Sequence, residues 1–248
     1  MRWRGNGCLL LAAFIWGTTF VAQSVGMENL GPFTYGVARF FLGVLALTGL
    51  WLLSGGWERR ETSARSFGVG AAAGGIMFVA SAFQQYGMVY TTAGKASFLT
   101  CLYLILVPLT GIFLRQHIRG EHWTGAALAV TGLYFLCVKE GLSLGTGDLL
   151  EICGAFFWTA HILFVDRFAA KVEAIAMSLA QVAVVFLLNL AMAVIFETAQ
   201  TADIAAAWFS LFYAGVLSTG VAFTLQIIGQ READPAPAAV IMSLESFF

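Results

Sequence analysis

The stretch 93–114, AGKASFLTCLYLILVPLTGIFL, constrains the fold of this chain more than any other. It holds 22 residues and a single charge, on Lys95 near its start. An α-helix rises about 1.5 Å per residue, and the hydrocarbon core of a bilayer is about 30 Å thick. A helix formed by this stretch is therefore long enough and apolar enough to cross a membrane.

The composition of the whole chain favours the same solvent. Hydrophobic residues make up 59% of the sequence and charged residues 11%, and the mean hydropathy is +0.83. A soluble domain carries about 25% charged residues. There is too little polar surface to cover a globule in water, so we expect a lipid bilayer around the protein. The net charge of −1 provides no basic field, and we expect no nucleic-acid partner.

Further apolar runs of spanning length are joined by short loops. They fall near 8–26, 33–53, 67–90, 93–114, 123–138, 149–168, 175–196 and 205–229, and a ninth begins near Pro235. No clear small-x-small cleavage site follows the first run, so we interpret it as a retained helix and not as a signal peptide. The pattern predicts an all-α, polytopic membrane helix bundle.

Lysine and arginine alternate between rich and poor loops along the chain. Ten of them fall in loops of one side: Arg2, Arg4, Arg59, Arg60, Arg65, Arg115, Arg119, Arg167, Lys171 and Arg231. Only Lys95 and Lys139 fall on the other side. The positive-inside rule places the rich side in the cytoplasm. We expect a multi-pass protein of the cytoplasmic membrane with a cytoplasmic N-terminus.

A weak internal repeat joins residues that are 142 positions apart. The aligned pairs include Trp16 with Trp158, Gln84 with Gln226, Gly87 with Gly229 and Tyr103 with Glu245. Each unit would hold five spans, and because five is odd the second unit enters the membrane from the opposite side. Such inverted repeats are common in secondary transporters. We expect units at 1–140 and 141–248, with nine of ten helices present and the ninth cut short.

Five segments together resemble a known family. They are LLAAFIWGTTFVA at 10–22, ARF at 38–40, KASFLTCLYLILVPL at 95–109, GAFFWTAHILFVDR at 154–167 and DPAPAAVIMSLESFF at 234–248. Their order and spacing resemble the drug/metabolite transporter superfamily, and within it the EamA-type permeases with ten helices. The resemblance implies two five-helix bundles around a central path for a small metabolite.

Polar groups inside hydrocarbon are costly, which makes each one a candidate functional residue. Counted at about 1.5 Å per residue, five aromatic or ionisable side chains fall near one level of the bilayer. They are Trp16, Tyr103, Trp158, His161 and Glu245. We expect these five to line a central substrate-binding cavity. The alternatives are packing or interface anchoring for the tryptophans, and hydrogen-bonded helix packing for the other groups.

Two ionisable candidates raise the question of proton coupling. Removal from water disfavours the charged form of a carboxyl or an imidazole, so Glu245 and His161 are hypothetical sites of proton uptake and release. Arg39, inside the second run, is a candidate for binding an anionic substrate group. The alternatives for Arg39 are snorkelling to the membrane surface and a structural ion pair.

Other features of the spans have simpler interpretations. Gly70-x-x-x-Gly74 and Ala71-x-x-x-Gly75 mark faces for close helix packing. Pro108 lacks an N–H group and is expected to kink the fourth span near its cytoplasmic end. Gln84 and Gln226 are expected to form hydrogen bonds between helices, and a role in gating is the alternative.

The sequence favours a secondary transporter of a small metabolite or drug-like compound over two other classes. An intramembrane enzyme would need a nucleophile and base or paired carboxylates, but only His161 could serve as the base and only Glu245 is an acid at mid-depth. A channel or structural subunit stays open as the third class. The four cysteines show no metal or redox spacing, and we expect no metal and no cofactor. Homodimer formation is left open.

Overall fold

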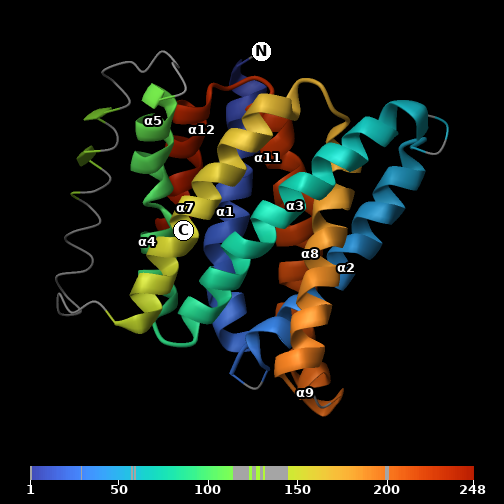
Figure 1. The fold of residues 1–248 in the computed structure, drawn as a ribbon, viewed down its shortest axis with the longest axis vertical. Coiled ribbons are helices and arrows are strands. Elements are labelled where there is room, and N and C mark those ends of the chain that lie inside the picture. The colour runs from blue at the N-terminus through green and yellow to red at the C-terminus, as the bar shows by residue number, and fades with distance from the viewer. Residues whose placement is uncertain are drawn as a thin grey trace.

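The fold comes from a computed structural model, which shows a bundle of helices (Figure 1). The structure describes residues 2–28, 30–56, 58, 60–113, 123, 124, 127, 128, 131, 145–198 and 201–248. Within these residues every regular element is a helix, as the apolar runs predicted. The run at 123–138 lies mostly outside the described residues.

The helices of the first half are α1 (Arg2–Gly26), α2 (Pro32–Leu53), α3 (Arg60–Met88), α4 (Ala93–Thr100) and α5 (Tyr103–Phe113). Those of the second half are α7 (Thr146–Ala169), α8 (Ala174–Phe196), α9 (Thr201–Ala206), α10 (Trp208–Phe212), the π-helix η1 (Tyr213–Ala222), α11 (Phe223–Gln230), α12 (Pro235–Met242) and the 3₁₀-helix η2 (Ser243–Ser246).

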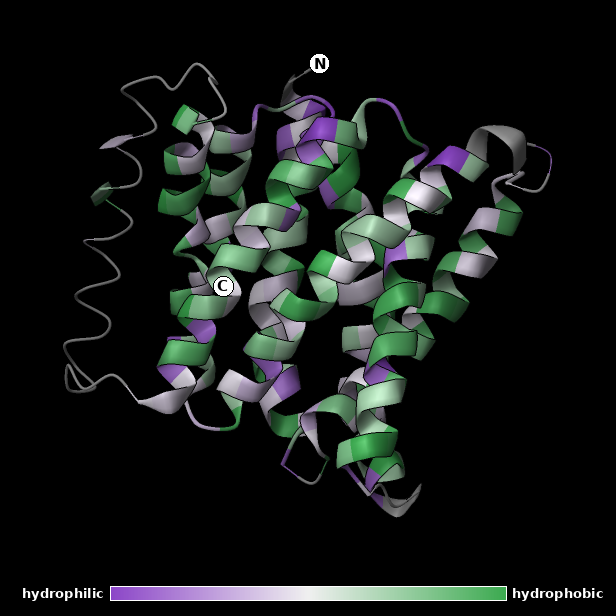
Figure 2. Cartoon of the chain, viewed as in Figure 1, coloured by the Kyte–Doolittle hydropathy of each residue, from purple (hydrophilic) through white to green (hydrophobic). Residues whose placement is uncertain are grey.

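The described residues contain seven segments long and apolar enough to cross a membrane. Hydrophilic residues concentrate at the two ends of the bundle and hydrophobic residues between them (Figure 2). Large apolar side chains such as Leu53, Phe113 and Val194 are 76–89% exposed, whereas Gln181 and His161 are fully buried. This distribution is the reverse of a water-soluble core and fits a protein surrounded by lipid.

The first helix of each half runs antiparallel to the other. At the start of α1 the Gly5 amide donates to Glu232 Oε2 at 3.2 Å, in the turn between α11 and α12. The same turn reaches the end of α7, where Arg231 Nε donates to the Ala169 carbonyl at 2.9 Å. Helix α1 therefore begins at the end of the bundle where α7 ends.

Further contacts show the same relationship for α2 and α8, and for α4 and α12. The amides of Phe33 and Thr34, at the start of α2, donate to the Glu197 carboxylate that follows α8, at 3.0 and 2.7 Å. The ion pair between Lys95 and Asp148, 2.8 Å long, joins the start of α4 to the start of α7, whereas α12 starts at the opposite end. The inverted arrangement expected from the 142-residue offset is therefore present in the packing.

The interruption of the fourth span differs from the kink expected at Pro108. Helix α4 ends at Thr100 and α5 begins at Tyr103, and the turn between them is closed by short i→i+3 bonds such as Leu102 N to Leu99 O, 3.1 Å. Pro108 lies inside α5 without ending it. The second half repeats the interruption, because α12 ends at Met242, which is 142 positions after Thr100, and η2 follows.

Small residues set the distance between α3 and α8. A Cβ atom on Gly70 would lie 2.4 Å from the Met177 carbonyl oxygen, and one on Gly74 would lie 2.7 Å from the Gln181 carbonyl oxygen. The close packing predicted for this glycine pair is confirmed. The second predicted face is wrong at Gly75, where an added Cβ would meet no atom within 4 Å.

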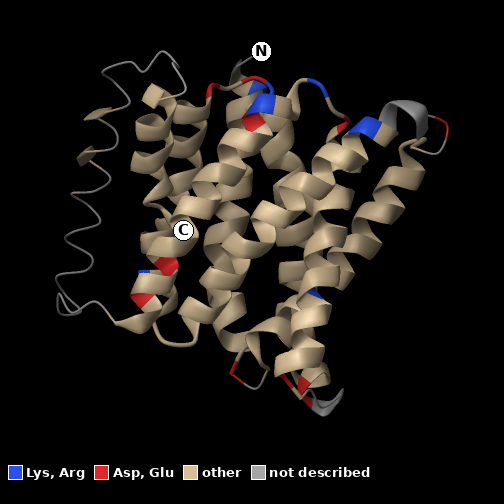
Figure 3. Cartoon of the chain, in the orientation of Figure 1, with Lys and Arg blue, Asp and Glu red and all other residues tan. Residues whose placement is uncertain are grey.

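The charged ends of the bundle differ from each other. Arg4, Arg65, Arg167, Lys171 and Arg231 lie at or near the end where α1 begins, and Figure 3 shows Lys and Arg gathered at that end. At the opposite end the described cation is Lys95, which pairs with an aspartate. This asymmetry agrees with the loop charges in the sequence.

Candidate functional site

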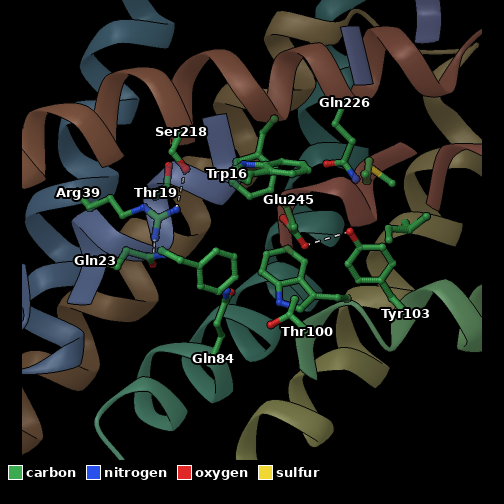
Figure 4. Close-up of a pocket in the computed structure, with 15 residues that line it drawn as sticks. Trp16, Thr19, Gln23, Arg39, Gln84, Thr100, Tyr103, Ser218, Gln226 and Glu245 are labelled. Atoms are coloured by element: carbon green, nitrogen blue, oxygen red, sulfur yellow. Dashed lines mark hydrogen bonds between the residues drawn. The ribbon is translucent and has the colours of Figure 1, made fainter. Parts of the chain in front are cut away.

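An internal cavity lies between the two halves, at the level of the helix interruptions (Figure 4). The centre of a water molecule has about 50 Å³ of space inside it. Its lining comes from both halves of the chain: Trp16, Thr19, Phe20, Gln23, Arg39, Gln84, Thr100, Tyr103, Trp158, Ile162, Ser218, Phe223, Gln226, Met242 and Glu245.

Most of this lining consists of residues that are equivalent in the two halves. Five pairs of lining residues are separated by 142 positions: Trp16 and Trp158, Phe20 and Ile162, Gln84 and Gln226, Thr100 and Met242, and Tyr103 and Glu245. Residues related by a twofold axis face the same space only when both lie near that axis. The cavity therefore lies on the pseudo-twofold axis between the halves.

Tyr103 and Glu245 face each other across the interrupted helices. The tyrosine hydroxyl donates to Glu245 Oε1 at 3.0 Å, and the Cys101 thiol lies 3.6 Å from the same oxygen. Glu245 is 6% exposed and Tyr103 is 4% exposed. A carboxyl so far from water is retained at a cost, which its hydrogen bonds reduce only in part.

Arg39 enters the cavity wall from α2 and does not snorkel to the membrane surface. It is 6% exposed, and its guanidinium donates to Gln23 Oε1, to Thr219 Oγ1 at 3.0 Å and to Ser218 Oγ at 3.2 Å. All three acceptors are neutral. In the part of the chain that the structure describes, no carboxylate forms an ion pair with Arg39. Its positive charge is therefore hydrogen-bonded without being neutralised.

The aromatic wall of the cavity surrounds the ring of Phe223. The Trp16 ring lies 5.0 Å from it and the Trp158 ring stacks on it at 6.2 Å, measured between centroids. Both indole Nε1 atoms are buried, and among the described residues they have no hydrogen-bond acceptor. Two N–H donors at equivalent positions of the two halves are thus without an acceptor among the described residues.

The two glutamines predicted to bond between helices both line the cavity. Gln226 is 2% exposed, and its Oε1 atom has no donor among the described residues. Among the described residues, neither the Gln84 side chain nor the Gln226 side chain forms the predicted hydrogen bond to another helix. These amides add to the polar groups of a lining that also carries aromatic rings.

His161 lies behind the cavity wall and is not part of the lining. Its Nε2 atom bonds Gln181 Oε1 at 3.1 Å, and its ring meets the edge of Trp158 with centroids 5.8 Å apart. It is fully buried. Five of the six residues predicted to bind substrate therefore face one cavity, while His161 contacts one of them from outside.

Thr19, Gln23 and Ser218 line the cavity but were not predicted from the sequence. The first two share a face of α1 with Trp16, at positions i+3 and i+7, and that spacing is a signal available in the sequence. Ser218 lies in the π-helix η1, whose widened turns change the direction of its side chains. No helical pattern in the sequence predicts that direction.

The fold and cavity define a polytopic membrane protein with inverted halves around a buried polar site, which is the architecture of a membrane transporter. The chain belongs to the EamA-like transporter family, whose model matches residues 3–138 and 145–248. It is therefore a membrane transporter of the drug/metabolite transporter superfamily, as the sequence motifs predicted.

Two relatives agree with this assignment, and one solved structure agrees with the fold. An uncharacterized transporter of Archaeoglobus fulgidus is 30% identical over 241 residues, which cover 97% of this chain and 74% of the relative. The uncharacterized transporter YoaV of Bacillus subtilis is 25% identical, over 94% of this chain and 82% of the relative. A crystal structure with 19% identity matches the fold with a TM-score of 0.84, over 99% of this chain and 85% of that one.

Proposed function

We propose that this protein is a secondary transporter that moves a small metabolite or drug-like compound across the cytoplasmic membrane by alternating access. The cavity on the pseudo-twofold axis is its binding site, and Trp16, Arg39, Tyr103, Trp158 and Glu245 contact the substrate. His161 acts indirectly, by holding Trp158. The two repeats are residues 1–140 and 141–248.

The observation that carries this proposal is the set of unsatisfied polar groups around the cavity. The indole N–H groups of Trp16 and Trp158 and the amide oxygen of Gln226 lack partners among the described residues. Arg39 adds a charge without a counter-ion in the same part of the chain. Buried polar groups in proteins are nearly always hydrogen-bonded, so these groups support the binding of a molecule in the cavity. The aromatic rings would hold its apolar part.

Alternating access is supported by the size and position of the cavity. A site for a small molecule has a volume of about 300 Å³ or more, whereas this cavity offers about 50 Å³ to the centre of a water molecule. Substrate entry therefore requires the halves to move apart. The interrupted helices α4–α5 and α12–η2 meet at the cavity, and broken helices at the binding site are a recurring feature of inverted-repeat transporters.

Orientation and coupling complete the proposal. The cationic end, where α1 begins, lies in the cytoplasm by the positive-inside rule. Glu245 is a site where a proton is taken up and released during transport.

The test is uptake of radiolabelled compounds into proteoliposomes that contain the purified protein. The panel covers amino acids, aromatic metabolites, nucleosides and amphiphilic drugs. We expect saturable uptake of at least one compound, and trans-stimulation by the same compound inside the vesicles. The replacement Trp16→Phe removes one orphan N–H group and should weaken uptake, whereas Trp208→Phe, at a residue that is 65% exposed, is the matched control.

The same experiment separates the other two classes. A channel would give uptake that neither saturates nor responds to compound on the far side of the membrane. An intramembrane enzyme would convert a compound in the panel, which chromatography of the vesicle contents would reveal. Either result would overturn the proposal.

A further inference from the structure

A track of polar side chains runs from the Lys95 end of the molecule toward the cavity. Asp148 accepts hydrogen bonds from Thr91 Oγ1 at 2.7 Å and from Lys95 Nζ at 2.8 Å. One turn further along α7, Glu151 accepts a hydrogen bond from Thr100 Oγ1 at 3.1 Å. Thr100 lines the cavity. The track therefore connects a polar end of the bundle with the binding site.

The equivalent track is missing from the other half of the molecule. The counterparts of the five track residues Thr91, Lys95, Thr100, Asp148 and Glu151, each 142 positions away, are Ala233, Pro237, Met242, Asn6 and Leu9. Leu9 and Met242 belong to one apolar cluster of the core. In one half of the molecule, the apolar pair Leu9 and Met242 therefore occupies the positions that Glu151 and Thr100 occupy in the other half. The packing of these helices does not by itself require Glu151.

Glu151 is a buried acid with an incomplete hydrogen-bond shell. Its exposed fraction is 1%, and among the described residues its Oε1 atom has no partner. Helix α3 covers it with Gly87, where an added Cβ would lie 2.7 Å from Oε1. An ionised carboxylate in such a place is costly unless it is paired with a cation. Binding a proton removes that cost.

The nearest charged groups to Glu151 lie on α7 and α4. On α7 the neighbour is Asp148, whose carboxylate pairs with Lys95 of α4. The last two turns of α3, residues 82–88, contain no charged residue. In the part of the chain that the structure describes, no ion pair is formed by Glu151 itself.

We propose that Glu151 is a proton-binding site that carries protons between the Lys95 end of the protein and the cavity. A carboxylate oxygen of Glu151 takes up a proton from the aqueous end beside Asp148 and becomes a neutral carboxyl. It passes this proton to Thr100 Oγ1, while the hydroxyl proton of Thr100 is taken up by a water molecule in the cavity that Glu245 also lines. Thr100 remains neutral, and water is the only other reactant.

The direction of this path follows from its asymmetry. The track exists only in the half of the bundle that faces the Lys95 end, which is the outer side in the proposed orientation. Protons therefore reach the cavity from outside without crossing the cytoplasmic end. The role of this path in coupling rests on the proposed transport function, whereas proton binding by Glu151 does not.

Infrared titration of the purified protein in liposomes tests the proton site. The wild-type protein should show the carbonyl band of a protonated buried carboxyl, which disappears as the pH is raised and is absent in Glu151→Gln. Glu58→Gln, at an exposed turn residue, should leave the band unchanged. If the wild-type and Glu151→Gln proteins titrate alike, Glu151 does not exchange a proton and the proposal is wrong.

Folding and transport are checked separately. The double variant Glu151→Leu/Thr100→Met copies the apolar pair of the other half, so it should keep the melting temperature while losing the band. With a compound identified in the panel, Glu151→Gln should lose at least tenfold in accumulation driven by a pH gradient but keep exchange at equal pH. Loss of exchange as well would assign Glu151 a structural role. Absence of transport by the wild type would overturn the proposed function and leave the infrared result standing.

Discussion

Tyr103 donates a hydrogen bond to Glu245 at 3.0 Å, and the two residues are 142 positions apart in the chain. They are therefore equivalent positions of the two halves that touch each other. Under a twofold relationship, a residue contacts its own equivalent only near the axis. This contact lies in the cavity wall at the point where the halves meet, so the pair is sensitive to any movement of one half against the other.

Substitution at this pair should affect binding and coupling differently. Tyr103→Phe removes one hydrogen bond, worth about 0.5–1.5 kcal/mol, and should raise the half-saturation concentration roughly two- to tenfold. Glu245→Gln removes the proton site in the cavity, so the pH dependence of uptake should flatten. Uptake in proteoliposomes across a pH series measures both. An unchanged pH profile in Glu245→Gln would remove this residue from proton coupling.

Arg39→Gln should weaken binding of compounds that carry an anionic group. A hydrogen bond to a charged group contributes about 1.5–3 kcal/mol, which corresponds to roughly 10- to 150-fold in affinity. Arg39→Lys keeps the charge but loses the fork of donors that reaches Ser218 and Thr219, and should retain part of the affinity. Competition by carboxylate and uncharged amide forms of the same compound measures the effect. An equal loss of affinity for the carboxylate and amide forms would mean that Arg39 does not recognise the negative charge of the compound.

Gly70→Val should destabilise the protein, because its Cβ would overlap the backbone of α8 at the Met177 carbonyl. Overpacking of this kind costs about 1–3 kcal/mol. Gly75→Val adds the same side chain little more than one turn away, where nothing lies within 4 Å, and is the matched control. Melting of the purified proteins in detergent should show a lower midpoint for the first variant only. Equal midpoints would mean that α3 and α8 separate without cost.

Accessibility of introduced cysteines tests the orientation. Val89, in the turn before α4, and Lys171, in the turn after α7, lie at opposite ends of the bundle. In a cysteine-free background, an impermeant thiol reagent applied to intact cells should label Val89→Cys and should label Lys171→Cys only after the membrane is opened. The reverse pattern would invert the proposed topology. Labelling of both in intact cells would contradict the inverted arrangement itself.

His161→Gln should change stability more than transport. The histidine bonds Gln181 and supports the ring of Trp158 from outside the cavity. Loss of this buried bond costs about 0.5–1.5 kcal/mol, so the melting midpoint should fall. The pH dependence of uptake should remain that of the wild type. A flattened pH profile would return His161 to the list of proton carriers.

The inverted bundle was predictable because its causes are local or periodic in the sequence. Apolar runs, loop charges and the 142-residue offset define the spans, their direction and their pairing. The offset aligned Tyr103 with Glu245 and Trp16 with Trp158, and all four line the cavity. Depth along a helix follows from counting residues, which explains why these mid-span residues were found.

Rotation about the helix axis and contact with other helices were not predictable in the same way. His161 has the right depth but points behind the wall, where Gln181 binds it. Glu151 follows the expected start of its span so closely that counting residues places it near the surface, yet Gly87 of α3 covers it. The fourth span breaks at Cys101 and not at Pro108, at the level where the two halves meet.

Hydropathy, loop charge and internal repetition depend only on the order of residues along the chain. The sequence alone therefore predicts a membrane bundle, its family and the depth of its polar residues. Which of those residues meet is a property of packing, because a helix at the correct depth can present any of its sides to the axis. The arrangement of α1, α3, α7 and α11 around that axis leaves Arg39 without a counter-ion among the described residues, buries Glu151, and brings Tyr103 against Glu245.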